Sequence, residues 1–258
     1  DEAGTILHRA RRETPARSTS AIAEAIVEVA VELAALATTS GLGAVESVGL
    51  GAAGLVDETR QIVRVAPKLS WAEEPLAAQA SAGCGPTVVV ENDANAAAWG
   101  EFRFGAGRAE HSLVMVTVGT GIGGGIVLRN HLVRGAYGMA AEFGHLGRVP
   151  DGRLCGCGKR GCWEQYASGN ALLREARELA ADQRDRASLL LSLGDGTPEG
   201  VKGKHVTAAA RQGDPVALEA FDHIGRWLGT GLADVAALLD PAMFVIGGGV
   251  SEAGDLLL

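Results

Sequence analysis

Residues 112–133 read SLVMVTVGTGIGGGIVLRNHLV, two apolar runs rich in β-branched residues on either side of a glycine turn. Gly119, Gly121 and Gly124 match the G-x-G-x-x-G fingerprint of dinucleotide-binding folds, but that fingerprint requires a helix directly after the glycines. The residues after this turn, GIVLRNHLV, carry no helix-start signal. The stretch therefore predicts strand, turn and strand. It excludes a Rossmann turn and, without Gly-Lys-Ser/Thr, a P-loop. Backbone N–H groups in such a turn can hold a phosphate, although a tight hairpin without a ligand is the alternative.

Strands and helices alternate on both sides of this hairpin, which predicts an α/β protein. Before the hairpin we expect a helix capped by Ser18 or Ser20, strands in 44–57, 61–67 and 86–92, a short helix in 72–82 and a helix over 93–104. After it we expect helices near 170–182, 206–211 and 214–239, a surface loop over 194–205 and a strand in 242–249.

The composition excludes several classes of protein. The 258 residues suffice for one large or two small domains with a sizeable core. A net charge of −8 argues against a nucleic-acid partner held by a basic surface. No apolar run is long enough to span a membrane, and we expect neither a membrane partner nor a signal peptide. Four cysteines in a chain of this length do not form a disulfide scaffold, so we predict a cytoplasmic protein with reduced thiols.

Polar residues crowd the end of one predicted strand, in VVVENDANAAA (88–98). Asn92 or Asp93 can cap the helix that follows, and a cap alone is the simpler interpretation of Asp93. However, ligands bind at the carboxyl ends of strands in open α/β sheets. Glu91 and Asn95 add more polar groups than a cap needs, so Asn92 and Asp93 are candidate site residues.

Residues 145–164, HLGRVPDGRLCGCGKRGCWE, hold three of the four cysteines. A disulfide, a redox thiol pair and a metal site compete as interpretations. His145, Cys155, Cys157 and Cys162 give the spacing H-x9-C-x-C-x4-C, and Cys3His is a closed tetrahedral zinc set. Because four protein ligands leave no open position, the spacing favours a structural rather than a catalytic zinc ion, over the alternative of three reduced thiols.

The remaining cysteine and histidines have no ligand-like neighbours in the sequence. We interpret Cys84 as a packed small hydrophobe. The other histidines are interpreted as structural or exposed: His8, His111, His131, His205 and His223.

Several of these stretches together resemble the ROK family (repressors, uncharacterised reading frames and sugar kinases). The resemblance rests on ENDAN (91–95), VGTGIGGGIV (118–127), AAEFGHLG (140–147) and CGCGKRGCWE (155–164), in this order and spacing. It extends to VGLGAAGLVD (48–57) and VIGGGVS (245–251), and so covers nearly the whole chain. Within the family the chain is most similar to glucokinases of the actinobacterial type.

The resemblance implies an actin-like (ribonuclease H-like) α/β sugar kinase fold of two lobes, with the active site in the cleft and a zinc-bound loop. It implies a small lobe over residues 1–107, without the N-terminal phosphate loop, and a large lobe over 108–258, without its C-terminal part. The implied activity is ATP-dependent phosphorylation of glucose at the 6-hydroxyl, with ATP, Mg²⁺ and structural Zn²⁺ bound. The implied assembly is a homodimer or homotetramer.

The resemblance also implies residue roles. Asp93 is the expected general base, and the expected ligands of the other sugar hydroxyls are Asn92, Glu142, His145 and Glu164. The expected nucleotide-binding residues are Gly119, Thr120 and Gly121 at the phosphates and Gly247, Gly248 and Gly249 at the adenosine. The expected zinc ligands are His145, Cys155, Cys157 and Cys162. On this view the zinc loop positions sugar-binding groups, while the glycine loops lie elsewhere, so loss of zinc should change ATP affinity much less than sugar affinity.

Three features differ from the family pattern. An Asp-x-Gly-Gly-Thr phosphate loop near the N-terminus and a helical segment after VIGGGVS both lie outside this chain. Lys68, in APKLSW, stands where Asn or His is more usual. The alternatives that remain are a kinase for another hexose or an N-acetylated amino sugar, and a sugar-responsive ROK transcriptional repressor. A bare zinc-binding module would leave ENDAN unexplained.

Overall fold

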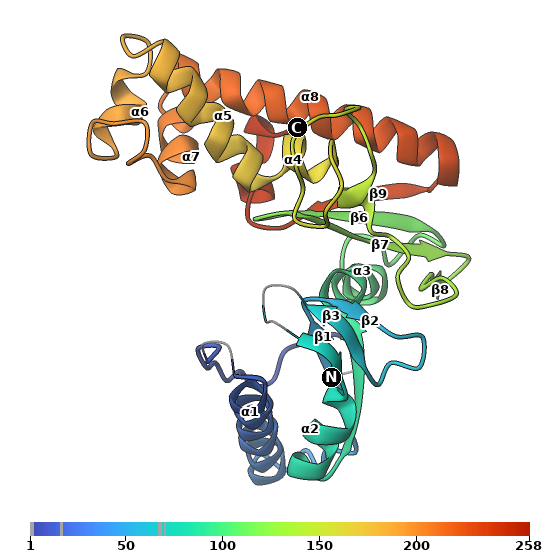
Figure 1. Cartoon of the computed structure of the whole chain (residues 1–258). Coiled ribbons are helices and arrows are strands. Elements are labelled where there is room, and N and C mark those ends of the chain that lie inside the picture. Colours follow the sequence, from blue (N-terminus) through green and yellow to red (C-terminus); the bar gives the residue numbers. More distant parts are fainter. Residues whose placement is uncertain (1–2, 16–17, 67–68, 70) are drawn as a thin grey trace. The chain divides into compact units, whose positions relative to one another are not determined.

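The chain forms two compact units in a computed structural model that describes residues 3–15, 18–66, 69 and 71–258 (Figure 1). The first unit comprises Asp1–His111 and Gly125–Ala141, and the second comprises Ser112–Gly124 and Glu142–Leu258. The lobe boundary at 107/108 stays a prediction, and Lys68 lies outside the described residues. Among the helices of the described ranges, none has both the length and the apolar character that crossing a bilayer requires.

The first unit contains two small sheets and three helices within its described residues. Strands β1 (Ser47–Ala52) and β5 (Thr87–Asn92) pair in parallel, with Gly51 opposite Glu91 and Ala52 opposite Asn92. The second sheet is antiparallel, in the order β2 (Leu55–Val56), β3 (Val63–Ala66) and β4 (Trp71–Glu74). The helices are α1 (Thr19–Thr39), α2 (Leu76–Cys84) and α3 (Asp93–Phe104). As predicted, Ser18 caps α1, and its hydroxyl oxygen accepts the Ala21 N–H at 3.3 Å.

One predicted element in this unit is partly wrong. The expected helix over 72–82 begins only at Leu76, because residues 72–74 belong to β4. Ala72 and Glu74 lie opposite Val65 and Val63 of β3, so pairing with a neighbouring strand decides their conformation. Pro75, which lacks an N–H, then separates the strand from the helix.

The second unit holds the glycine turn and most of the helices. The predicted strand–turn–strand is confirmed, because β6 (Leu113–Val118) is followed by a turn and by β7 (Ile122–Leu128). From Gly125 onward β7 belongs to the first unit, and so does the next strand, β8 (His131–Leu132). Strand β6 also pairs in parallel with β9 (Met243–Gly247). The remaining elements are η1 (Phe143–His145), α4 (Glu164–Ala167), α5 (Gly169–Asp182), α6 (Ser188–Ser192), α7 (Gly203–Arg211), α8 (Pro215–Leu239) and η2 (Ser251–Leu256).

The predictions for this unit hold best for long elements. Helices α5, α7 and α8 lie near their predicted positions, but α4 and α6 were not predicted because four or five residues show too little periodicity. The predicted loop over 194–205 ends early, since α7 begins at Gly203. Asp214 starts α8 because its carboxylate accepts the N–H groups of Val216 and Ala217, at 3.0 and 2.9 Å.

Trp163 anchors the end of the cysteine-rich loop to α8. Its side chain is fully buried, and its indole N–H donates to the Trp227 carbonyl at 2.8 Å. Gly231 of α8 faces the same indole, and a Cβ at this position would overlap the ring. The close approach of helix and ring therefore requires glycine at 231. Gly229, on the same helix, has open space where a Cβ would lie.

These two glycines should respond oppositely to alanine. Gly231→Ala should lower the free energy of unfolding by about 1–3 kcal/mol, because overpacking against a buried ring outweighs the helix propensity of alanine. Gly229→Ala should raise the free energy of unfolding by up to about 1 kcal/mol, through propensity alone. Urea denaturation of both variants and the wild type measures this difference. Stabilisation by both substitutions would show that α8 does not pack on Trp163 as described.

Candidate functional site

The cysteine-rich loop folds as a hairpin that brings its two ends together. Gly147 and Cys162 form an antiparallel bridge at its base, and Leu154 and Arg160 form another near its tip. Gly161 has a φ of +73°, and a Cβ there would overlap the Val149 carbonyl oxygen. Glycine at this position is therefore needed for the hairpin to close.

The hairpin gathers the four predicted zinc ligands. We call these residues the Cys3His cluster: His145, Cys155, Cys157 and Cys162. Each offers one ligand atom, and the four atoms lie within 4.8 Å of one another. His145 Nδ1 lies 3.6 Å from Cys155 Sγ, and the Sγ atoms of Cys157 and Cys162 are 3.6 Å apart. Tetrahedral zinc with Zn–S of about 2.3 Å and Zn–N of about 2.1 Å separates its ligand atoms by about 3.5–3.8 Å. The cluster fits a zinc ion, and the chain's four cysteines, all within described residues, are free thiols.

The thiols of the cluster differ in their acidity. Burial raises the pKa of the Cys162 thiol to about 12, and hydrogen bonds with Cys157 and Cys155 act in the same direction. Burial also opposes ionisation of Cys157, but hydrogen bonds from the Lys159 backbone and the two neighbouring thiols outweigh it, so the pKa of Cys157 is lowered. Zinc binds thiolates, so binding to this cluster would release protons.

The ring of His145 faces two different neighbours. Its Nδ1 points at the cluster through Cys155, whereas its Nε2 lies 3.9 Å from the Glu142 carboxylate. Glu142 directly precedes the single turn η1 that carries His145. A metal ion on Nδ1 would therefore leave Nε2 beside Glu142 on the other side of the ring. Metal-bound histidines usually have their second nitrogen fixed by a hydrogen-bond partner, and 3.9 Å is too long for such a bond from Nε2 to Glu142.

Glu164 joins the cysteine-rich loop to the glycine turn, defined as Gly119–Gly121. One carboxylate oxygen, Oε2, accepts the Ile122 N–H at 3.1 Å, and a Cβ on Gly121 would overlap that oxygen. The expectation that the glycine turn lies elsewhere is therefore wrong. Because Glu164 follows Cys162 by two residues, loss of a zinc ion from the cluster should disturb the glycine turn as well as Glu164.

The two predicted nucleotide stretches lie side by side. The Val250 N–H, directly after Gly249, donates to the Val118 carbonyl at 2.9 Å, at the start of the glycine turn. Gly248 has a φ of +91°, and a Cβ there would lie 2.6 Å from the same carbonyl oxygen. Two glycine-rich backbone segments thus meet at Val118 in the second unit, and exposed backbone N–H groups of such segments suit a phosphate.

In the first unit, Asn92 rather than Asp93 caps α3. The Asn92 side chain accepts the Asn95 N–H at 3.0 Å and donates to the Gly54 carbonyl at 3.0 Å. Asp93 is exposed, and its Oδ1 accepts the adjacent Ala94 N–H at 2.9 Å. Since Asn92 supplies the cap, the interpretation of Asp93 as a cap alone is wrong, and its carboxylate can serve a ligand.

Glu91 has a structural role that the sequence did not reveal. Its Oε2 lies 2.7 Å from Arg134 Nε and 3.7 Å from Arg60 Nε. Its Oε1 accepts the Asn92 N–H at 3.2 Å and an amide hydrogen of Asn95 at 3.3 Å. The side chain is only 13% exposed, so Glu91 holds the junction of β5 and α3 in place. Both arginines lie far away along the chain, and no local pattern marks them as partners.

The remaining cysteine and histidines lie outside the cluster, as predicted. Cys84 is half-buried, with its Sγ 3.9 Å from the Pro86 carbonyl oxygen. Four of the histidines contact other groups through a ring nitrogen, and the contacts are His8 with Ser40, His131 with the Arg129 carbonyl, His205 with the Lys202 N–H and His223 with Glu175. His111 is exposed.

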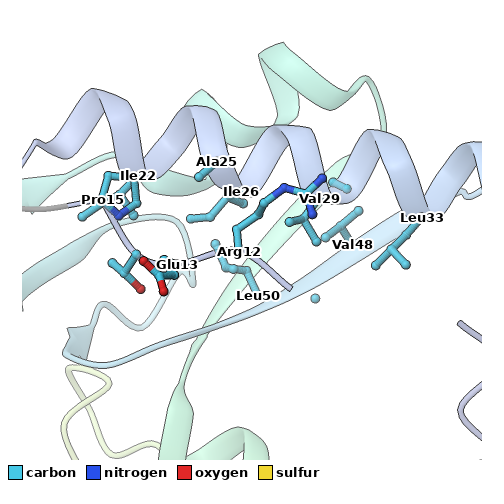
Figure 2. A pocket seen from close by; sticks show the side chains of 13 residues that line it. Arg12, Glu13, Pro15, Ile22, Ala25, Ile26, Val29, Leu33, Val48 and Leu50 are labelled. Carbon is cyan, nitrogen blue, oxygen red and sulfur yellow. The ribbon is translucent and has the colours of Figure 1, made fainter. Parts of the chain in front are cut away.

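A groove in the first unit carries none of the predicted site residues. It has a volume of about 320 Å³ and runs between α1 and β1 (Figure 2). Its lining is mostly apolar, with Ile22, Ile26 and Leu50 among the residues that face it. Arg12 on its rim forms an ion pair with Glu32 of α1. The polar residues of its lining are Arg12, Glu13 and Thr14, and none of them is a predicted site residue.

Comparison with known proteins places these features in one family. Residues 1–258 match the sequence profile of the ROK family. The chain is 52% identical to a glucokinase of Streptomyces coelicolor, covering 100% of this chain and 79% of that protein. It is 41% identical to a glucokinase of Thermotoga maritima, covering 81% of this chain and 66% of that protein. A ROK family glucokinase from Streptomyces griseus, solved with glucose and AMPPNP, matches with a TM-score of 0.88 at 52% identity, covering 100% of this chain and 80% of that one.

The Cys3His cluster can be tested by metal analysis. Wild-type protein purified without chelators should contain about one zinc ion per chain, as one closed four-ligand site implies. Cys157→Ser should remove or loosen that ion, because serine is a poor zinc ligand, whereas Cys84→Ser, outside the cluster, should keep it. Elemental analysis of the three proteins measures the content. Wild-type protein that neither contains zinc nor takes it up would rule out a zinc site.

Proposed function

Because this chain belongs to the ROK family, we propose that it is a glucokinase, which transfers the terminal phosphoryl group of ATP to the 6-hydroxyl of glucose. The observation that carries this proposal is the match over the whole chain, at 52% identity, to a ROK glucokinase solved with glucose and AMPPNP. The same match establishes the α/β sugar kinase fold. The activity requires alignment of two substrates, stabilisation of charge on the phosphates and a base for the attacking hydroxyl.

We assign the general base to Asp93. Its carboxylate is exposed at the carboxyl end of β5, where ligands bind in α/β sheets, and Asn92 relieves it of the capping role. Neighbouring Glu91 is engaged by two arginines and is therefore a poor alternative base. Asp93 would accept the proton of the 6-hydroxyl as the oxygen attacks phosphorus.

The other sugar hydroxyls would be held by Asn92, Glu142, His145 and Glu164. These are carboxylates, an amide and an imidazole, which can each pair with hydroxyls that both donate and accept. The Nε2 of His145, turned away from the cluster, is the ring nitrogen available for this role. Structural zinc on the cluster would act by fixing His145 and Glu164 in place.

The glycine turn, which includes Thr120, would hold the phosphates. The adenosine would lie against Gly247, Gly248 and Gly249. The support is that both backbone segments meet beside Val118. Mg²⁺ would supply charge neutralisation on the phosphates, as in other phosphoryl transfers. We further propose a homodimer or homotetramer in the cytoplasm, where the thiols of the cluster stay reduced.

Replacing the proposed base should affect turnover more than binding. Asp93→Asn keeps the shape of the side chain but removes the proton acceptor, so kcat should fall about 10²–10⁴-fold. The Kd for glucose should change little, since the amide still forms hydrogen bonds. A coupled phosphorylation assay gives kcat, and calorimetry gives the Kd. Turnover within a few-fold of the wild type would show that Asp93 is not the base.

Sugar choice tests the assigned hydroxyl ligands. Galactose differs from glucose at the 4-hydroxyl and should leave a carboxylate or amide of the site unpaired, which costs about 1–3 kcal/mol. The kcat/KM for glucose should therefore exceed that for galactose at least about tenfold. The same assay with mannose, fructose and N-acetylated amino sugars tests the alternative hexose kinases. Sugar binding without phosphorylation of any of them would favour a repressor instead.

A further inference from the structure

We propose that Glu164 couples the two substrate sites, so that sugar bound at its carboxylate changes the affinity of the glycine turn for nucleotide, and the reverse. This proposal rests on the proposed function, in which Glu164 binds a sugar hydroxyl and the glycine turn binds phosphate. In the proposed function Glu164 serves only the sugar and the glycine turn serves only the nucleotide, and the proposal links the two.

The first observation concerns the space beside Gly121. Glu164 Oε2 occupies the place that a Cβ of residue 121 would take, while accepting the Ile122 N–H at 3.1 Å. Gly121 is not among the residues with positive φ, so its φ does not require glycine. A Cβ at 121 would therefore displace the Glu164 carboxylate, whereas the φ of residue 121 does not call for glycine. A Cβ on Gly119, two residues earlier, would meet open space.

The second observation is that the chain around Glu164 holds the turn at both ends. Glu164 begins α4 and binds the turn at Ile122, and α5 begins at Gly169, whose N–H donates to the Gly119 carbonyl at 2.7 Å. The buried Trp163 prevents this segment from shifting freely. A displacement of the Glu164 carboxylate therefore reaches the backbone of the turn through a direct hydrogen bond.

The third observation is that the two carboxylate oxygens face different neighbours. Oε2 faces the turn, whereas Oε1 lies 3.9 Å from Cys155 Sγ, on the side of the Cys3His cluster. A sugar hydroxyl bound to Oε1 would change the orientation of the carboxylate. It would therefore weaken or strengthen the hydrogen bond that Oε2 accepts from the Ile122 N–H. Binding at the two sites is then linked, and the linkage factor must be equal in both directions.

Two glycine variants of the same turn separate this proposal from a general effect on the turn. Gly121→Ala places a Cβ where Oε2 lies, so the carboxylate must move, and the Kd for glucose measured without nucleotide should rise about tenfold. Gly119→Ala places its Cβ in open space and should leave the Kd for glucose within about twofold of the wild type. Isothermal titration of glucose into each protein, with thermal unfolding as a check of folding, measures the difference.

The reverse direction uses a variant outside the turn. Glu164→Asp withdraws the carboxylate from the Ile122 N–H, so the Kd for AMPPNP measured without sugar should rise about fivefold, within the usual range of coupling between sites. In the wild type, saturating glucose should change the Kd for AMPPNP, and this change should shrink in Gly121→Ala.

Different negative results would overturn different proposals. Glucose that does not bind the wild-type protein would overturn the proposed function itself. Wild-type protein that binds glucose, with Gly121→Ala binding it equally well, would overturn the coupling alone. Equal weakening by Gly119→Ala and Gly121→Ala, or an unchanged Kd for AMPPNP in Glu164→Asp, would also overturn the coupling.

Discussion

Three consecutive residues, Cys162, Trp163 and Glu164, constrain the second unit because their side chains serve three different neighbours. The Cys162 thiol belongs to the Cys3His cluster, the Trp163 indole packs on α8, and the Glu164 carboxylate accepts the Ile122 N–H. None of the three can move without disturbing the other two contacts. The cluster, the helical core and the glycine turn are therefore fixed relative to one another by a single short segment of chain.

The sequence predicts best where a structure depends on neighbours along the chain. The hairpin of β6 and β7 follows from an apolar run, glycines and the lack of a helix start, all within 22 residues, 112–133. The Cys3His cluster follows from ligand spacing in one loop. The sequence leaves two adjacent candidates for the cap of α3, Asn92 and Asp93. The hydrogen bond from the Asn95 N–H to the Asn92 side chain identifies Asn92 as the cap. In each case the information lies within one continuous short stretch of the chain.

The failures share a different cause, because they depend on partners far away in the sequence. Residues 72–74 form a strand since β3 lies beside them, although their own pattern suits a helix. Glu91 is tied to Arg134, 43 residues away, and Glu164 binds Ile122, 42 residues away. Nothing local distinguishes these carboxylates from solvated ones, because pairing depends on how the chain folds back. The sequence therefore predicts neither the arginine partners of Glu91 nor the link from Glu164 to the glycine turn.

The glycines of the second unit show why such long-range contacts matter for function. Gly248 is required by its own positive φ, whereas at Gly231 and Gly121 side chains occupy the space that a Cβ atom would take. At Gly231 that side chain is an indole, which fixes packing. At Gly121 it is a carboxylate, which can also bind a hydroxyl. A turn whose glycines first indicate only phosphate binding thus also contains one position beside a carboxylate from a distant part of the chain. A structural ion near Cys162 would then influence both substrates through the same carboxylate, without taking part in the chemistry.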